Sequence, residues 1–271
     1  MSVLKIWNNL GHNFRRVYIP QHILFLAGII SIITGHTSAW WLLLVYPAWF
    51  LFGHIGFGIF IHKYWCHKSF KTQPWIARLG GYLGSLAGTG SPIMLAGLHI
   101  GYHHRYSDTD QDPHTPRKGF WWSYFLWLNH KWDFKNSSVR KVVRDLMRDP
   151  YLKFLHKNYY KIYWATFLAL CLIDWRLAVF SMSAATVIEF HLSGIVNTYG
   201  HTPHRWSYQN YQVDDSQNIP WLNWLTLGLG LHNNHHGRPG EYNYAHKKGE
   251  IDFAAWFVPL IEIKEEKNGQ N

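Results

Sequence analysis

Long stretches without charged residues alternate with polar segments along this chain. Residues 17–62 contain no Asp, Glu, Lys or Arg. A helix that crosses a bilayer needs roughly 20 apolar residues, so this stretch is long enough for two crossings. It predicts membrane spans at about 18–35 and 39–61, joined by a tight turn at Gly35–Ser38.

A second stretch poor in charge runs from Ile162 to Thr198 and is interrupted by Asp174-Trp175-Arg176 and by Glu189. It predicts spans at about 160–174 and 177–198. A third apolar stretch, Ile76–Leu98, contains six Gly, and we expect a buried or interfacial helical segment there. The pattern therefore predicts an all-α integral membrane protein with four transmembrane helices in two hairpins. We expect a single domain over residues 1–271.

The net charge of +10 is distributed unevenly. Lys5, Arg15 and Arg16 precede the first predicted span, whereas the two predicted turns carry only Arg176. By the positive-inside rule, the termini and the segments 62–159 and 199–271 face the cytosol, as a helical cap on a bacterial inner membrane or endoplasmic reticulum protein. Every basic segment has a membrane explanation, so we expect the lipid bilayer as a partner and no nucleic acid.

Three histidine clusters each follow an apolar stretch: His62-Lys-Tyr-Trp-Cys-His67, His99-Ile-Gly-Tyr-His103-His104 and His232-Asn-Asn-His235-His236. Neutral imidazole is a common ligand of redox metals, and eight imidazoles exceed the needs of one mononuclear site. The predicted topology brings all three clusters to the cytosolic side. We therefore expect two metal ions held by the cytosolic cap.

The spacing within the clusters fits helices, where residues four apart share one face. His99 and His103 are four apart, as are His232 and His236, and as are Asn197 and His201 at the end of the last span. His62 and His67 are five apart, which indicates that the helix loosens between them.

The remaining histidines are expected to be interfacial or structural residues. They are His12, His22, His36, His54, His130, His156, His204 and His246, with His114 and His191 as residues that could lie just behind the ligands. The two cysteines, Cys66 and Cys171, suggest neither a disulfide framework nor an iron–sulfur centre.

These residues resemble the membrane-bound fatty acid desaturases, in particular the acyl-CoA-type Δ9 enzymes. The first cluster resembles the H-x4-H box of that family and the third its H-x2-H-H box. The resemblance also covers Arg105–Asp110, Asp112–Pro116, Gly119–Ser123, Asp145–Pro150 and the Asn197-x3-His201 pair, in the same order from His62 to Tyr242. The second box departs from the family, because it reads H-x3-H-H where the acyl-CoA type has H-x2-H-H.

The resemblance implies a di-iron centre that uses O2 and two electrons to introduce a cis double bond into an acyl chain. It implies ten metal-binding residues, with Asn197 acting through a water: His62, His67, His99, His103, His104, Asn197, His201, His232, His235 and His236. The acyl chain could be linked to CoA, a carrier protein or a lipid. No electron-transfer module is visible, so electrons are expected from a separate donor, such as a cytochrome b5-like protein or a ferredoxin.

Two alternatives stay open. A related di-iron hydroxylase acting on a lipid or hydrocarbon would use the same ligands, because both reactions begin by breaking a C–H bond. A non-catalytic metal transporter or metal-binding membrane protein is a different class. Transporters place their ionisable ligands near the middle of the membrane, whereas the clusters here lie at or beyond the ends of the spans.

Overall fold

The computed structural model describes residues 11–130 and 132–264. Lys5 and the predicted cytosolic positions of both chain ends lie outside these described residues. Within them the protein is helical, and the only β pairing consists of three isolated bridges. The predicted all-α class is confirmed for the described part of the chain.

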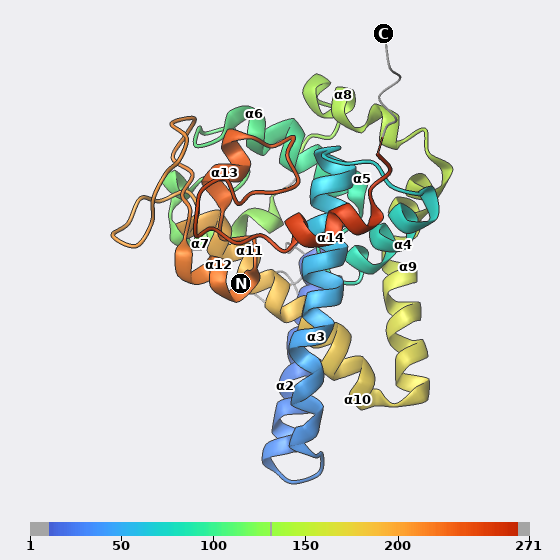
Figure 1. Ribbon diagram of the computed structural model, residues 1–271. Helices are drawn as coiled ribbons and strands as arrows, with labels where there is room; N and C mark the ends of the chain where they lie inside the picture. Colours follow the sequence, from blue (N-terminus) through green and yellow to red (C-terminus); the bar gives the residue numbers. More distant parts are fainter. Residues whose placement is uncertain (1–10, 131, 265–271) are drawn as a thin grey trace, which may run out of the picture.

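The first helical pair comes from the charge-free stretch. A π-helical turn, η1 (Phe14–Tyr18), leads into α2 (Ile19–Ile33), and residues 34–38 form a turn in which Gly35 has a positive φ of 77°. The chain then returns through η2 (Ala39–Leu44), α3 (Val45–Trp49) and the long π-helical η3 (Phe50–Cys66). In Figure 1 both helical stretches run to the 34–38 turn, which projects away from the rest of the molecule.

The second helical pair begins earlier than the sequence predicts. Helix α9 (Pro150–Ile173) starts at Pro150 because Asp149 accepts hydrogen bonds from the first backbone N–H groups, and it includes the predicted span 160–174. Asp174 then caps α10 (Trp175–Ala178), which continues through η7 (Val179–Ser183) into α11 (Ala184–Tyr199).

Three described helical segments are long and apolar enough to cross a membrane: Phe14–Ile33, Ala39–Cys66 and Trp175–Tyr199. Helix α9 is not among them. Four crossings in two membrane hairpins therefore stay a prediction.

The other helices are short and gather at the end of the molecule opposite the 34–38 turn (Figure 1). The predicted segment Ile76–Leu98 is helical but divided into α4 and α5. In chain order these helices are α4 (Pro74–Ser85), α5 (Pro92–Leu98), η4 (His99–His103), α6 (His104–Tyr106), η5 (Pro116–Lys118), α7 (Phe120–Tyr124), η6 (Leu126–Asn129), α8 (Ser137–Leu146), α12 (Pro220–Thr226), α13 (His232–Gly237) and α14 (Ala254–Ile261).

Glycine allows η3 and α4 to approach closely. A Cβ atom at Gly56 would overlap the backbone of Gly84, and one at Gly84 would overlap the backbone of Gly56. Small residues at a crossing of this kind let helix backbones touch. The contact fixes the end of η3, where His62 lies, against the short helices of the cap.

Candidate metal centre

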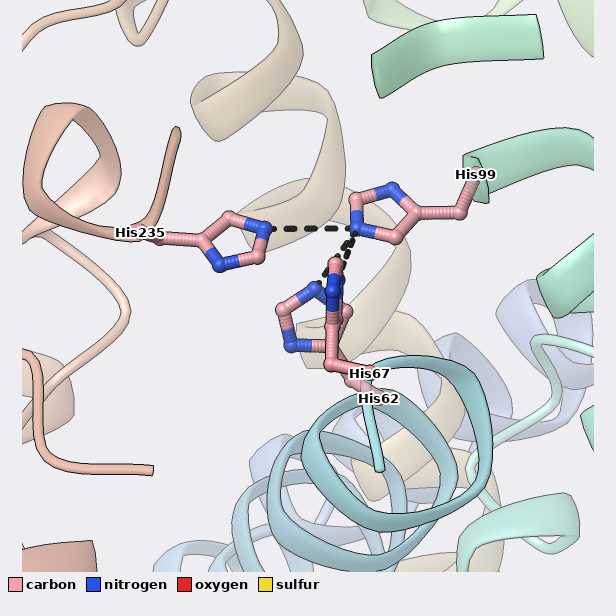
Figure 2. Close-up of side chains that lie close together, drawn as sticks. All are labelled: His62, His67, His99 and His235. Carbon is pink, nitrogen blue, oxygen red and sulfur yellow. Dashed lines mark hydrogen bonds between the residues drawn. The ribbon is translucent and has the colours of Figure 1, made fainter. Parts of the chain in front are cut away.

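One set of imidazoles meets where η3, η4 and α13 end or begin. Nε2 of His99 lies 2.8 Å from Nε2 of His62, 3.0 Å from that of His67 and 3.3 Å from that of His235. Figure 2 shows the four rings pointing at one another from three separate segments. Residues more than 170 positions apart in sequence thus form one cluster that could hold a metal ion.

The π-helical form of η3 and η4 accounts for the spacing of the first two boxes. The backbone N–H of His67 donates to the carbonyl of His62 at 3.1 Å, a bond between residues five apart. The backbone N–H of His104 donates to His99 in the same way. A π turn therefore brings His99 and His104 to one face, and their Nε2 atoms lie 3.0 Å apart. Because a π turn contains one residue more than an α turn, His99 and His104 still face each other although the second box has one residue more than H-x2-H-H.

A second set of imidazoles lies beside the first and is largely buried. It comprises His103, His201, His232 and His236. The Nε2 atoms of His103 and His236 are 3.1 Å apart, and those of His201 and His232 are 2.9 Å apart. His104 lies between the sets, with its Nε2 2.9 Å from that of His235.

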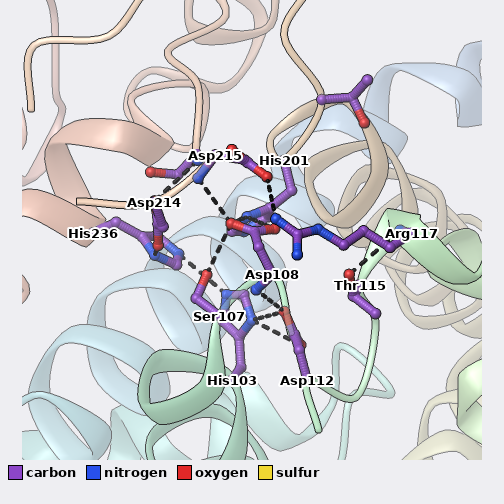
Figure 3. Close-up of polar contacts among 12 residues, drawn as sticks. His103, Ser107, Asp108, Asp112, Thr115, Arg117, His201, Asp214, Asp215 and His236 are labelled. Atoms are coloured by element: carbon purple, nitrogen blue, oxygen red, sulfur yellow. Dashed lines mark hydrogen bonds and ion pairs between the residues drawn. The ribbon is translucent and has the colours of Figure 1, made fainter. Parts of the chain in front are cut away.

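In three of these four histidines the second ring nitrogen, Nδ1, lies next to a carboxylate (Figure 3). Nδ1 of His103 lies 3.1 Å from both oxygens of Asp112. Nδ1 of His236 lies 2.6 Å from Asp214, and Nδ1 of His201 lies 3.1 Å from Asp108. A carboxylate beside Nδ1 keeps the proton there and leaves the lone pair of Nε2 free for a metal.

This tautomer makes the Nε2 contacts chemically informative. In neutral His103 and His236, both Nδ1 atoms donate to carboxylates, so two acceptor nitrogens face each other at 3.1 Å. Such a pair is repulsive unless a cation lies between the lone pairs. Two metal–nitrogen bonds of about 2.1 Å at a right angle separate their nitrogens by about 3.0 Å. The residues therefore fit a metal ion in donor type and in spacing.

Burial keeps most of these imidazoles neutral. It lowers the pKa of His67, His99, His104, His232, His235 and His236 well below the usual 6.5, and neighbouring histidines lower each pKa further. His201 differs, because its hydrogen bond to Asp108 and the nearby carboxylates outweigh burial and raise its pKa. Burial tends to raise the pKa of Asp112, but its interactions with His103 and His114 lower it overall. Neutral imidazole beside an ionised carboxylate is the form that binds metal.

Two asparagines inside the third box hold α13 in place. Asn233 accepts hydrogen bonds from the backbone N–H groups of Asn210 and Tyr211. Asn234 donates to the carbonyl of Tyr244 at 2.7 Å and to Glu250 at 2.9 Å. Both side chains are fully buried. They connect α13, with its three histidines, to the chain segments on either side, a role that sequence spacing does not indicate.

A largely apolar cavity adjoins both sets of imidazoles. His62, His99, His103, His232 and His235 contribute to its wall. Most of the remaining wall is apolar and includes Phe57, Leu95, Leu98, Phe190 and Leu229. Asn197 also faces this cavity, from α11. An apolar cavity that reaches a cluster of metal-binding groups suits a hydrocarbon chain.

Histidines outside the clusters have other surroundings. His114 packs on His103 with ring centroids 4.2 Å apart and lies 3.8 Å from Asp112, directly behind the second set. His54 is buried and stacked on Phe50, and His191 contacts His22. Cys66 is buried among apolar side chains, and both cysteines are free.

The protein thus belongs to the class of helical proteins in which histidines from the ends of apolar helices converge beside an apolar cavity. Residues 38–248 match the family described as fatty acid desaturase. The chain is 32% identical over 229 residues to the sn-2 palmitoyl-lipid 9-desaturase of Nostoc sp. (strain 36), covering 81% of this chain and 77% of the relative. It is 34% identical over 217 residues to the sn-1 stearoyl-lipid 9-desaturase of Anabaena variabilis, covering 78% and 76%.

A third relative, the acyl-CoA C20 Delta5-desaturase of Anemone leveillei, is 30% identical over 253 residues, covering 89% of this chain and 78% of the relative. The chain belongs to the fatty acid desaturase family, and it is accordingly an oxidoreductase of lipid metabolism.

Proposed function

We propose that the ten predicted residues hold two iron ions. The first ion would be bound by His62, His67, His99, His104 and His235. The second would be bound by His103, His201, His232 and His236, with Asn197 acting through a water. The observation that carries this proposal is the convergence of nine Nε2 atoms, supplied by distant segments, beside an apolar cavity that five of these histidines line.

With iron bound, the centre supplies the O2-dependent removal of two hydrogen atoms from neighbouring carbons, using two external electrons and leaving a cis double bond. The protein positions the chain for this step. The apolar wall holds the acyl chain in a fixed path and keeps water away from it. Asp108, Asp112 and Asp214 orient the imidazoles of the second set.

The substrate is an acyl chain desaturated at the Δ9 position. Two relatives whose names specify 9-desaturation of glycerolipid acyl chains support this assignment. A relative named as an acyl-CoA desaturase leaves CoA as a second possible carrier. A carrier protein is a third possible carrier of the acyl chain.

We place the protein in the membrane with four crossings and the metal centre on the cytosolic side. Apolar side chains that are largely exposed on α2 and at the end of α9 support this topology, including Ile33 at 77% and Leu172 at 90% exposure. A separate electron donor, such as a cytochrome b5-like protein or a ferredoxin, would dock on the cytosolic face.

The test is a fatty acid profile from a desaturase-deficient host that expresses the chain. Gas chromatography with mass spectrometry should detect new monounsaturated chains and locate the double bond. Variants His235→Ala and His236→Ala should abolish the product, because each removes a buried metal ligand. His36→Ala, in the distant 34–38 turn, is the matched control and should retain the product.

Metal analysis of the purified protein completes the test. About two iron ions per chain are expected, and the His235→Ala variant should hold fewer. Hydroxylated chains in place of unsaturated ones would move the assignment to a lipid hydroxylase. Absence of any product, together with absence of bound iron from an expressed and folded protein, would contradict the proposal.

A further inference from the structure

Glu189 is a buried carboxyl group inside an apolar helix that is long enough to cross a membrane. Its side chain is 1% exposed, and it belongs to neither set of imidazoles. Glu189, Ser193 and Asn197 are spaced four apart on α11, and all three face the cavity. An ionisable group in such a position is costly, so it indicates a function.

The carboxyl group of Glu189 joins α11 to α3. Its Oε2 accepts a hydrogen bond from Nε1 of Trp49 at 3.0 Å, and its Oε1 accepts one from the hydroxyl of Ser193 at 3.1 Å. Gly53 leaves room for this arrangement, since a Cβ atom there would lie 2.6 Å from both Oε2 and Nε1 of Trp49. Both partners of the Trp49–Glu189 bond are buried.

Glu189 is part of the cavity wall, whereas Trp49 and Gly53 lie behind that wall. On α11 the described wall begins at Glu189 and continues to Asn197, and on η3 it begins at Phe57, one turn beyond Gly53. The Trp49–Glu189 pair therefore bounds the cavity at the end of its α11 wall that is farther along the helix from Asn197. We call this pair, with Gly53 beside it, the polar floor of the cavity.

The distance from the metal centre to the floor corresponds to an acyl tail. Glu189 and Asn197 are eight residues apart on α11, which is about 12 Å along the helix. An extended chain advances about 1.2 Å per bond, so roughly ten bonds fit between the level of Asn197 and the floor. Beyond that point a methyl group would displace the hydrogen bonds of Glu189 and leave buried polar groups unpaired.

We propose that Glu189 is a specificity-determining residue whose carboxyl group limits the number of carbons between the new double bond and the methyl end of the chain. The inference rests on the proposed function, with the acyl chain lying in this cavity. Glu189→Ala removes the floor and opens space as far as the indole of Trp49. Glu189→Gln keeps a hydrogen-bonding group of the same size and is the matched control.

The experiment supplies saturated chains of 14, 16, 18, 20 and 22 carbons to hosts that express each protein, and measures conversion of each length. The quantity compared is the conversion of a chain two carbons longer than the preferred one, divided by the conversion of the preferred chain. We expect Glu189→Ala to raise this ratio about tenfold, because two further methylenes become buried in apolar surroundings. Glu189→Gln should keep the original length profile. Gly53→Ala, which should push the carboxyl group into the cavity, should shift the preference toward shorter chains.

A labelling experiment tests the same inference without catalysis. An acyl analogue that carries a diazirine at its methyl end, of the preferred length, should label the peptide containing Glu189 in the unaltered protein. Labelling elsewhere, or an unchanged length profile in Glu189→Ala and Gly53→Ala, would overturn the inference. An unaltered protein that converts no chain of any length would instead contradict the proposed function.

Discussion

Individual carboxylates determine how the second set of imidazoles presents its nitrogens. Asp112 is fully buried and contacts Nδ1 of His103 with both oxygens. Its side chain also accepts hydrogen bonds from the backbone N–H groups of Asp108 and His114, which fixes the loop behind the site. One aspartate thus orients the imidazole of His103 and organises the segment that supplies another carboxylate.

Replacing Asp112 with Asn should weaken metal binding by about 10–100-fold, the usual effect of losing a carboxylate that supports a histidine ligand. The amide keeps the size of the side chain but removes the charge that holds the proton on Nδ1 of His103. The measurement is iron retained per chain during titration with a chelator. Asp110→Asn is the control, because Asp110 is exposed and lies two residues away. Equal iron retention by the two variants would contradict this role.

At this scale the sequence predicts the imidazoles better than their partners. The histidine boxes are visible because they repeat a ligand type at helical spacing. Asp214 and His236 are 22 residues apart, and Asp108 and His201 are 93 apart, so no local pattern pairs them. Glu189 is visible as an interruption of an apolar stretch, but its partner Trp49 is 140 residues away.

Helices η3 and η4 depart from the regular α-helix, and this departure brings their histidine side chains to one face. The five-residue spacing of His62 and His67 indicates a loosened helix, and the structure has a π-helix there. The same device serves the second box, where the four-residue spacing of His99 and His103 favours an ordinary helix and conceals the π turn. The division of Ile76–Leu98 into α4 and α5 is also hidden from hydropathy, because both helices are mainly apolar.

The close crossing of η3 and α4 gives a prediction for this scale. Gly56→Ala should destabilise the protein by about 1–3 kcal/mol, because the new methyl group would overlap the backbone of Gly84 and force the helices apart. Thermal unfolding in detergent should show a midpoint lowered by several degrees. Gly58→Ala is the matched control on the same helix, since the nearest atom to its Cβ would be 3.6 Å away. Equal midpoints for the two variants would show that the crossing tolerates separation.

The whole molecule brings together segments that no sequence window contains. The two sets of imidazoles draw on the ends of η3 and α11, on η4 and α6, and on α13 near the other end of the chain. The apolar stretches predict the long helices, and the ends of those helices predict where ligands lie. The cavity and its polar floor depend on how α11 packs against α3 and η3, which only the three-dimensional structure defines.

Convergence of so many buried imidazoles makes the stability of the molecule depend on pH and metal. Burial holds the pKa of His99, His232 and His235 well below 6.5 in the folded state, whereas the unfolded chain takes up these protons as the pH falls through about 6.5. The unfolded state then binds more protons, so stability must fall as the pH decreases below that value. Each such histidine contributes a slope of up to about 1.4 kcal/mol per pH unit.

Bound metal should act in the same direction, because only neutral imidazole is a ligand and protons compete for the same nitrogens. We expect iron-loaded protein to unfold at a higher temperature than chelated protein at pH 8, since a ligand that binds only the folded state stabilises it. The difference should shrink toward pH 5.5 as the metal is released. Thermal unfolding of both forms across this range, with iron content measured at each pH, checks the prediction. A constant difference at all pH values would mean that the metal is not held by these imidazoles.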